Sequence, residues 1–449
     1  MSLLDPLFRS EALLALFSDR ARLGGMLAFE TALARAEATT GVIPKEAAAA
    51  IAGQCSAEDY DIGAIGRAAA DAGNLAIPLI RELTARVAKA DPQAARHVHW
   101  GATSQDAIDT GFVLQLRPAL EHVLAVLARL AAALARLAES HRATPIVART
   151  WMQHAVPTSF GLKAAGWLDA ILRHRGRLVE VRARALVLQL GGAGGNLAAL
   201  GDRGLDVAKA LSEELELPLP DLPWHAHRDR PAEVATALGL LAGTLGKIAR
   251  DVALHAQTEI AELGEPLAEG RGGSSSMPHK QNPVSSAVTL AAATRVPGLV
   301  AAMLAAMVQE DERGLGGWHV EWETLPEIVT LVGGALEHMM RVMEGLRVDA
   351  ARMSANLEAS RGLVFAEAAE TALAARVGRA EARRLVEAAC RRVQAQGLHL
   401  REALAADPEI ARQLPPVELA GLFDARRQLG VADRLIDRAL ASARAKAGA

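Results

Sequence analysis

The chain has 449 residues, of which 51% are hydrophobic and only 3% are aromatic, and its formal net charge is −3. This near balance of charge gives no electrostatic reason to expect a nucleic-acid or membrane-surface partner. A core so poor in aromatic residues must be built from alanine, leucine and valine, which favours closely packed helices over sheets. The two cysteines, Cys55 and Cys390, are far apart and are expected to be reduced thiols.

The N-terminal segment does not resemble a secretion signal, because Asp5 and Arg9 fall where an apolar region would have to begin. The longest uncharged stretch, which follows Arg295, is too short to span a bilayer. We therefore expect a soluble cytoplasmic protein without a membrane partner.

Apolar residues alternate at steps of four and three over two long segments, residues 120–138 and 234–255. Pro118 precedes the first segment, where a helix start is expected. Sustained spacing of this kind predicts long helices packed side by side in a bundle. Three more long helices are expected over residues 160–190, 284–309 with a kink at Pro297, and 326–346, and loops are expected over 191–204, 264–283 and 313–317.

These segments predict an all-α fold of three helical domains. We expect an N-terminal helical domain over residues 1–110, a central bundle of long helices over 111–350, and a smaller helical domain over 351–449. Stretches such as Ala128–Ala135 and Ala301–Ala306 make several helices apolar on most sides. One chain would struggle to cover five such helices, so we expect subunits to share the core.

The most informative loop reads G-G-S-S-S-M-P-H-K-Q-N-P over residues 272–283. The glycine pair lets the backbone bend, and three serine hydroxyls follow on this stretch. Pro278 then stiffens the chain before Lys280 and Asn282. Hydroxyls beside a cation and an amide donor suit chemistry that builds negative charge on an oxygen.

This loop resembles the signature loop of the fumarase/aspartase superfamily at every specified position. The resemblance implies a homotetramer in which residues of three subunits form each active site, and it implies no cofactor. It further implies that Ser274 carries a proton at the carbon beside a substrate carboxylate. Lys280 and Asn282 would stabilise the charge that develops on that carboxylate.

Two other segments resemble motif regions of the same superfamily. In H-V-H-W-G-A-T-S-Q-D-A-I-D-T, residues 97–110, Thr103 and Ser104 match a pair that holds a substrate carboxylate, and Gln105 is a weaker candidate. In R-T-W-M-Q-H-A-V-P-T-S-F-G, residues 149–161, Thr150 is a second anchor for a carboxylate and His154 a weaker one. The substrate implied is therefore a small polycarboxylate.

Trp151 stands where relatives that eliminate an amine or hydroxide have a histidine. Those leaving groups need a general acid, whereas a carboxylate, with a pKa of about 4, leaves a lactone without a proton. The chain also resembles the bacterial 3-carboxy-cis,cis-muconate cycloisomerase branch of the superfamily, in the protocatechuate branch of the β-ketoadipate pathway, over residues 72–79 and 314–326. An adenylosuccinate lyase-like enzyme and a non-enzymatic structural member remain the alternatives.

Several other features carry weaker signals. The pairs His97/His99 and His225/His227 have a spacing that could suit a metal, but no cysteine or acidic partner completes a ligand set, so we interpret them as hydrogen-bonded polar side chains. The glycine-rich run at 191–195 is interpreted as a tight interhelix loop. Five tryptophans are expected to wall a dry pocket, namely Trp100, Trp151, Trp224, Trp318 and Trp322.

Overall fold

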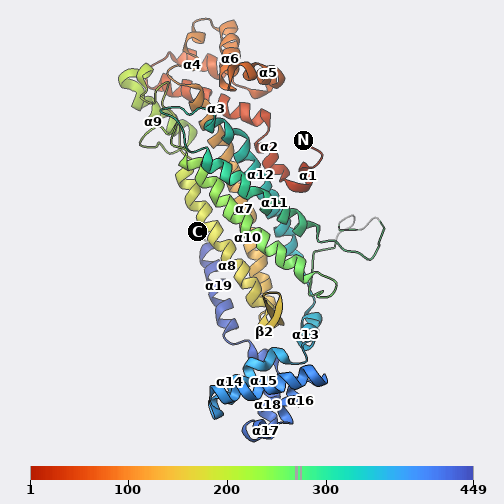
Figure 1. Cartoon of the computed structure of the whole chain (residues 1–449). Helices are drawn as coiled ribbons and strands as arrows, with labels where there is room; N and C mark the ends of the chain where they lie inside the picture. The colour runs from red at the N-terminus through yellow and green to blue at the C-terminus, as the bar shows by residue number, and fades with distance from the viewer. Residues whose placement is uncertain (1, 268–271, 274–275, 448–449) are drawn as a thin grey trace. The chain divides into compact units, whose positions relative to one another are not determined.

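The computed structural model describes residues 2–267, 272–273 and 276–447, and helices dominate these residues (Figure 1). This confirms the predicted all-α class. The α-helices are α1 Asp5–Phe8, α2 Glu11–Leu16, α3 Asp19–Thr39, α4 Lys45–Ala52, α5 Ile62–Ala72, α6 Ala76–Ala90, α7 Ser104–Ser140, α8 Phe160–Ala185, α9 Gly204–Leu215, α10 Asp229–His255, α11 Val284–Ala305, α12 Gly317–Glu344, α13 Ala350–Glu358, α14 Ala366–Val377, α15 Arg379–Gln396, α16 Leu400–Ala405, α17 Pro408–Gln413, α18 Pro416–Leu422 and α19 Ala432–Ala447.

Short strands and 3-10 turns complete the described fold. The strands β1 Pro145–Thr150 and β2 Gln153–Ser159 form one antiparallel pair, and β3 Leu263–Gly264 and β4 Arg347–Val348 form another. The 3-10 turns are η1 Ala57–Asp59, η2 Ala94–His97, η3 Ala198–Arg203, η4 Leu363–Phe365 and η5 Ala425–Gln428.

The long helices are where the sequence predicts them, but α10 begins five residues earlier than predicted, and α7 and α12 begin earlier still. Helix α7 starts at Ser104 and α12 at Gly317, so Pro118 and Pro326 lie inside helices instead of marking their starts. A proline removes one backbone hydrogen bond and costs about 3 kcal/mol in a helix interior. In α7 the complete burial of the adjacent Ala119 and Leu120 offsets that cost.

The chain folds into two compact units, and each unit takes part of the five long helices α7, α8, α10, α11 and α12. Unit 1 comprises residues 1–126, 174–245 and 288–337, and unit 2 comprises residues 127–173, 246–287 and 338–449. The division into three domains predicted from the sequence stays a prediction.

Unit 1 has an apolar core among its N-terminal helices, where α4, α5 and α6 lie near α3 (Figure 1). Leu27, Leu79 and Leu83 are fully buried there. Helix α3 also meets α7 backbone to backbone, because a Cβ atom on Gly25 would stand 2.5 Å from the carbonyl oxygen of Gly111. Only glycine permits this approach, which fixes α3 against the start of α7.

Unit 2 contains the hairpin β1–β2 and the C-terminal helices. A second apolar core holds helices α14 to α18 together around fully buried residues such as Leu373, Leu400 and Ile410 (Figure 1). A smaller cluster of Val147 of β1 with Leu357, Val364 and Phe365 packs the hairpin against the segment from α13 to η4. The hairpin is therefore anchored at its base by the C-terminal part of the unit.

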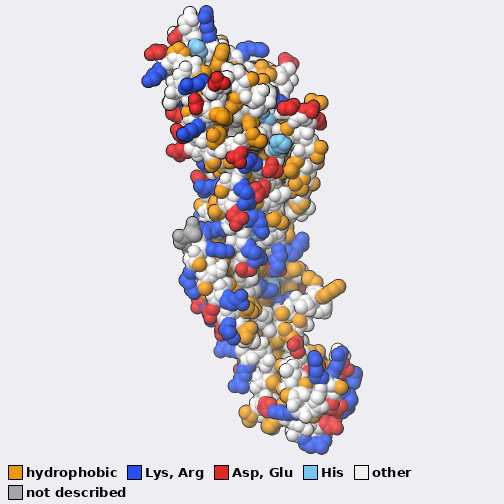
Figure 2. Space-filling view, turned by 90° about the vertical axis from the view of Figure 1, so that its left-hand side faces the viewer, with side chains coloured by type: hydrophobic (Ala, Val, Ile, Leu, Met, Phe, Trp, Pro, Cys, Tyr) orange, Lys and Arg blue, Asp and Glu red, His pale blue; other side chains and the backbone are white. Residues whose placement is uncertain are grey.

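Three helices are long and apolar enough to cross a membrane by length and composition alone, namely α7, α10 and α11. The sequence prediction considered only the uncharged run after Arg295, whereas an 18-residue window of α11 includes that arginine and still has a mean hydropathy of 1.6. Only 28% of that window is buried within the chain. Hydrophobic side chains are exposed among charged ones on the face seen in Figure 2.

A buried ion-pair centre holds unit 2 together at Glu262. Its side chain is completely buried and accepts two hydrogen bonds from Arg149, at 2.8 and 2.9 Å. His255 lies 2.6 Å from the same carboxylate, and the amide of Asn356 donates to it at 2.8 Å. Burial alone would raise the pKa of Glu262, but its hydrogen bonds to His255, Arg149 and Asn356 outweigh burial and lower the pKa to about 2.

We predict that Glu262 makes the protein sensitive to acid. Because its folded pKa is below the ordinary value of about 4.3, its stabilisation is complete above that pH and is lost as the pH falls toward 2. Glu262→Gln should lower the free energy of unfolding by roughly 3 kcal/mol near neutral pH and flatten its acid dependence. Urea unfolding at fixed protein concentration measures both effects.

Glu259→Gln is the matched control, because it removes a carboxylate from an exposed side chain three residues away. It should change the free energy of unfolding by less than about 0.5 kcal/mol. Equal losses in the two variants would contradict the role assigned to Glu262.

Candidate active site

The signature loop is described only in part. Ser274, the predicted proton carrier, lies outside the described residues, whereas Lys280 and Asn282 lie within them and Lys280 is exposed. Asn282 closes the base of the loop, since its backbone N–H donates to the carbonyl of Gly272 at 2.8 Å. A Cβ atom on Gly272 would stand 2.8 Å from the carbonyl oxygen of Asn282, so this closure requires the glycine.

A carboxylate anchors the chain where the loop continues into α11. Glu265 accepts hydrogen bonds from the backbone N–H groups of Ser285 and Ser286, at 3.0 and 2.7 Å, and from the Ser286 hydroxyl at 2.8 Å. These donors are first-turn groups that the helix itself cannot satisfy. The segment that carries Lys280 and Asn282 is thereby joined to a rigid helix start.

The predicted carboxylate-binding pair lies at the start of another helix. Ser104 is the first residue of α7, and Thr103 precedes it. The approach to this turn is bent, because His99 and Gly101 have φ angles of 57° and 71°. The N-terminus of a long helix attracts anions through its free N–H groups and its dipole, which suits a carboxylate ligand.

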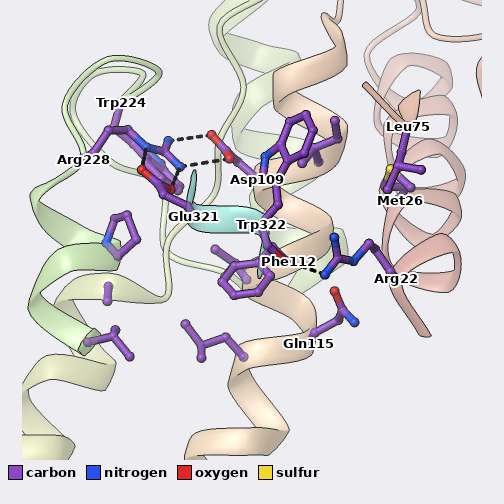
Figure 3. A pocket seen from close by; sticks show the side chains of 16 residues that line it. Arg22, Met26, Leu75, Asp109, Phe112, Gln115, Trp224, Arg228, Glu321 and Trp322 are labelled. Carbon is purple, nitrogen blue, oxygen red and sulfur yellow. Dashed lines mark hydrogen bonds and ion pairs between the residues drawn. The ribbon is translucent and has the colours of Figure 1, made fainter. Parts of the chain in front are cut away.

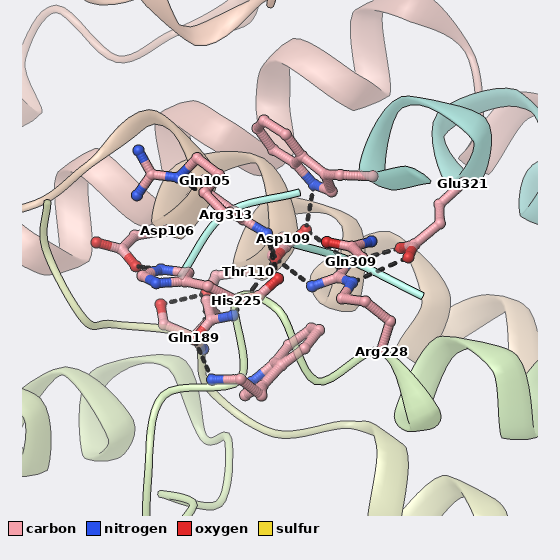
Figure 4. Close-up of polar contacts among 12 residues, drawn as sticks. Gln105, Asp106, Asp109, Thr110, Gln189, His225, Arg228, Gln309, Arg313 and Glu321 are labelled. Atoms are coloured by element: carbon pink, nitrogen blue, oxygen red, sulfur yellow. Dashed lines mark hydrogen bonds and ion pairs between the residues drawn. The ribbon is translucent and has the colours of Figure 1, made fainter. Parts of the chain in front are cut away.

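Asp106 is completely buried and holds the turn at Thr103 in place through hydrogen bonds (Figure 4). It accepts hydrogen bonds from the backbone N–H groups of Thr103, Gly191 and Gly192 at 2.9 to 3.0 Å. The ring of His225 lies 2.6 Å from the same carboxylate. The glycine-rich run is therefore a tight loop between helices, as predicted, and it supports the turn at Thr103.

Gln105 is buried, and its amide group is already used within unit 1. It donates to the backbone carbonyl of His225 at 2.8 Å and to Asp109 at 3.2 Å, and its oxygen accepts from Arg313 at 3.2 Å (Figure 4). Arg313 also donates to the carbonyl of Ala193. Gln105 thus links the start of α7 to the segments that carry His225 and Arg313. That it contacts the substrate remains a prediction.

Beside this network, Arg228 lies between two buried carboxylates (Figure 3). It donates to Asp109 at 2.7 and 3.1 Å and to Glu321 at 2.9 and 2.5 Å. Burial raises the pKa of Glu321, and the charge of Arg228 only partly opposes this. These residues line a cavity of about 40 Å³, space for a few water molecules but not for a polycarboxylate.

In unit 2, the other predicted anchor lies at the tip of the hairpin β1–β2. Thr150 pairs with Gln153, so Trp151 and Met152 form a two-residue turn with φ angles of 52° and 66°. Such turns favour asparagine and glycine. The Trp151 side chain is 98% exposed and Met152 is 69% exposed. His154, also exposed, has its pKa lowered by partial burial and by the charge of Arg149.

The five tryptophans are divided between the two units and between buried and exposed positions. Trp224 and Trp322 line the small cavity, and Trp318 packs edge-on against Trp322 at 4.8 Å. Trp100 and Trp151 are exposed instead. The prediction that all five wall a single dry pocket stays a prediction, because Trp151 belongs to unit 2, the other four belong to unit 1, and Ser274 lies outside the described residues.

Of the four histidines in the two closely spaced pairs, two have the polar hydrogen-bond partners that we expected. His99 lies 2.6 Å from Glu30 and His225 lies 2.6 Å from Asp106. Among the described residues, no three histidine, cysteine or acidic side chains are grouped as ligands for a metal. The sequence did not single out these carboxylate partners. Glu30 lies far in sequence from the motif that it supports, and Asp106 lies inside the 97–110 motif, where the notable residues were the neighbouring hydroxyls.

Comparison with known families places the whole chain in one superfamily. A family model described as lyase matches residues 8–298, and a model described as adenylosuccinate lyase C-terminus matches residues 362–439. The chain therefore belongs to the lyase family of the fumarase/aspartase superfamily, as its motifs predicted.

Individual relatives cover almost the full length. The chain is 53% identical to a 3-carboxy-cis,cis-muconate cycloisomerase of Bradyrhizobium diazoefficiens, over 98% of both proteins. It is 56% identical to that of Pseudomonas aeruginosa, over 98% of this chain and 96% of the relative. The crystal structure of 3-carboxy-cis,cis-muconate lactonizing enzyme from Pseudomonas putida matches with a TM-score of 0.94 at 52% identity, over 98% of this chain and 99% of that one.

Proposed function

We propose that this member of the fumarase/aspartase superfamily converts 3-carboxy-cis,cis-muconate to 4-carboxymuconolactone. The observation that carries the proposal is the full-length similarity to enzymes named for this reaction, at 53 to 56% identity. Trp151 agrees with it, because lactone formation and opening need no acid for a leaving amine. The substrate is a small polycarboxylate and the reaction is an intramolecular addition.

In the proposed mechanism, an oxygen of one substrate carboxylate attacks the conjugated double bond and forms the C–O bond of the lactone. The electron pair of the double bond moves toward the carbon beside another carboxylate and gives an enolate-like dianion. Ser274 donates a proton to that carbon, and in the reverse direction its anion removes the proton. A serine anion needs nearby positive charge, which Lys280 supplies together with the amide of Asn282.

The remaining substrate carboxylates would bind to two anchors, one at the start of α7 and one in the hairpin β1–β2. Thr103 and Ser104 offer hydroxyls at the start of a 37-residue helix, and Thr150 offers one beside Arg149. Gln105 and His154 stay weaker candidates for the same task. Holding the carboxylate close to the carbon that it attacks supplies much of the rate enhancement in an intramolecular addition.

We further propose a homotetramer whose active sites are shared between subunits. Helix α11 supports this, because Ala291, Thr294, Gly298, Ala301 and Ala305 are spaced by three and four residues and are mostly exposed. Small residues at this spacing let helices of several copies approach closely. The exposed, apolar tip at Trp151 would likewise be covered by another copy.

The direct test is to add purified protein to 3-carboxy-cis,cis-muconate and follow the loss of ultraviolet absorbance of the diene. We expect rapid loss with the wild-type protein. Ser274→Ala should lower kcat by roughly a thousandfold or more with a small change in KM, because the proton transfer is lost. Ser276→Ala is the matched control two residues away and should retain most of the activity.

Inertness toward the muconate together with brisk cleavage of adenylosuccinate would overturn the proposed function and favour the amine lyase. Near-normal turnover of Ser274→Ala would transfer the proton role to Ser275, Ser276 or a histidine.

The second test concerns Trp151. If the residue supplies shape and excludes water from the diene, Trp151→His should lower cycloisomerase activity by about tenfold or more without creating adenylosuccinate cleavage. Trp151→Phe keeps an apolar ring and should lose less. Steady-state assays of both variants with both substrates measure this, and appreciable adenylosuccinate cleavage by Trp151→His would contradict our interpretation.

The third test concerns the shared sites. If Ser274 and Trp151 of one site come from different subunits, coexpressing Ser274→Ala and Trp151→His chains should restore about a quarter of the sites in randomly mixed tetramers. Each variant alone provides the baseline. Tetramers by sedimentation with no recovery of activity would show that one chain supplies both residues.

A further inference from the structure

Two glutamates are buried on one face of α3, behind the turn that carries the predicted carboxylate anchors. Glu30 and Glu37 are seven residues apart, two helical turns, and are 1% and 0% exposed. Glu30 Oε1 lies 2.6 Å from His99 Nδ1. Within the described part of the chain, Glu30 Oε2 and both carboxyl oxygens of Glu37 have no hydrogen-bond partner.

Two ionised carboxylates at such positions would be very costly, since a buried charge needs a partner. Burial, reinforced by the negative charge of Glu30, raises the pKa of Glu37 to about 9. The nearby thiol of Cys55 also stays neutral, since burial raises its pKa to about 11. Glu37 is therefore uncharged at neutral pH.

Glu30 also acts on the pKa of His99. Burial alone would lower the pKa of His99, but the charge and hydrogen bond of Glu30, helped by Asp106, outweigh burial and raise it. Nδ1 donates to Glu30, and in the described residues Nε2 has no partner. The side chain is 15% exposed, and its backbone φ of 57° lies in the left-handed region, which histidine adopts more readily than most residues other than glycine.

We propose that Glu30 is a positioning residue which, with Glu37 buried behind it, orients the His99 ring through Nδ1 and favours its protonated form, so that Nε2 is available to a substrate carboxylate. The proposal rests on the proposed function for the identity of the anion. His99 and Thr103 belong to one turn, because the carboxylate that binds the Thr103 N–H, Asp106, is close enough to influence His99.

The arrangement explains why one acid is left without a partner. If Glu37 were ionised, the negative charge near His99 would exceed the single positive charge of its protonated ring. The excess negative charge would repel an anionic substrate. A neutral Glu37 fills the same volume without that charge. In its protonated form, His99 adds one more positive group to a site that must bind several carboxylates at once.

Two isosteric variants separate charge from shape. Glu30→Gln keeps an acceptor for Nδ1–H but removes the negative charge, whereas Glu37→Gln replaces a neutral acid by a neutral amide and is the matched control. We measure the rate at which diethyl pyrocarbonate modifies His99 as a function of pH, by mass spectrometry of the peptide. This reagent attacks neutral imidazole, so the midpoint reports protonation of His99 without any substrate.

We expect the midpoint for His99 to move to lower pH in Glu30→Gln and to stay in place in Glu37→Gln. In muconate assays, kcat/KM of Glu30→Gln should fall about tenfold to a hundredfold at neutral pH, mainly through KM, and its alkaline limb should move to lower pH. Glu37→Gln should stay within about twofold of the wild type.

Two results would overturn the proposal: a modification midpoint of His99 in the wild-type protein no higher than that of an ordinary histidine, or equal shifts of this midpoint in both variants. The wild-type measurement remains a valid test even if Glu30→Gln does not fold. If the wild-type protein does not turn over the muconate, the proposed function is contradicted. The protonation of His99 can still be measured in that case, because the modification experiment uses no substrate.

Discussion

The candidate site depends on buried carboxylates that hold main-chain turns in place. Asp106 binds three backbone N–H groups and His225, and so joins the start of α7 to the glycine-rich loop. Without an acceptor there, three buried donors would be unsatisfied at a cost of about 1 to 3 kcal/mol each. This carboxylate therefore fixes the backbone of the turn that carries Thr103 and Ser104.

The same principle recurs in unit 2, where Glu262 binds Arg149, the residue before Thr150. In each unit the buried acid, Asp106 or Glu262, has hydrogen-bond donors around its carboxylate. These donors offset its negative charge, so the acid opposes an anionic substrate only weakly. Each anchor therefore combines hydroxyl side chains that are exposed or partly exposed with a buried acid that fixes the backbone near them. A site for a polycarboxylate can thus be built on acids without repelling its ligand.

The sequence predicted the helical class, the long helices and the loops, because periodic apolar residues and glycine report these locally. It misplaced the starts of α7 and α12, since tertiary burial outweighed the helix-breaking tendency of Pro118 and Pro326. The motifs identified the anchors, but not the acids that support them. Glu262 and Glu30 act through contacts distant in sequence, and nothing in their local spacing distinguishes them from surface acids. Asp106 lies inside the 97–110 segment and binds the Thr103 N–H three residues away, but its contacts with the glycine-rich loop and His225 are distant in sequence.

The hairpin tip connects the chemistry with the assembly. Trp151 and Met152 both adopt left-handed backbone conformations, which cost about 1 to 2 kcal/mol per residue outside glycine. Their exposed side chains add an unfavourable apolar surface, and burying a tryptophan of about 200 Å² would recover roughly 5 kcal/mol. In the proposed tetramer, one residue therefore does two things: it stabilises the strained turn by packing on another copy, and it gives that copy's site an apolar wall where amine lyases need an acid.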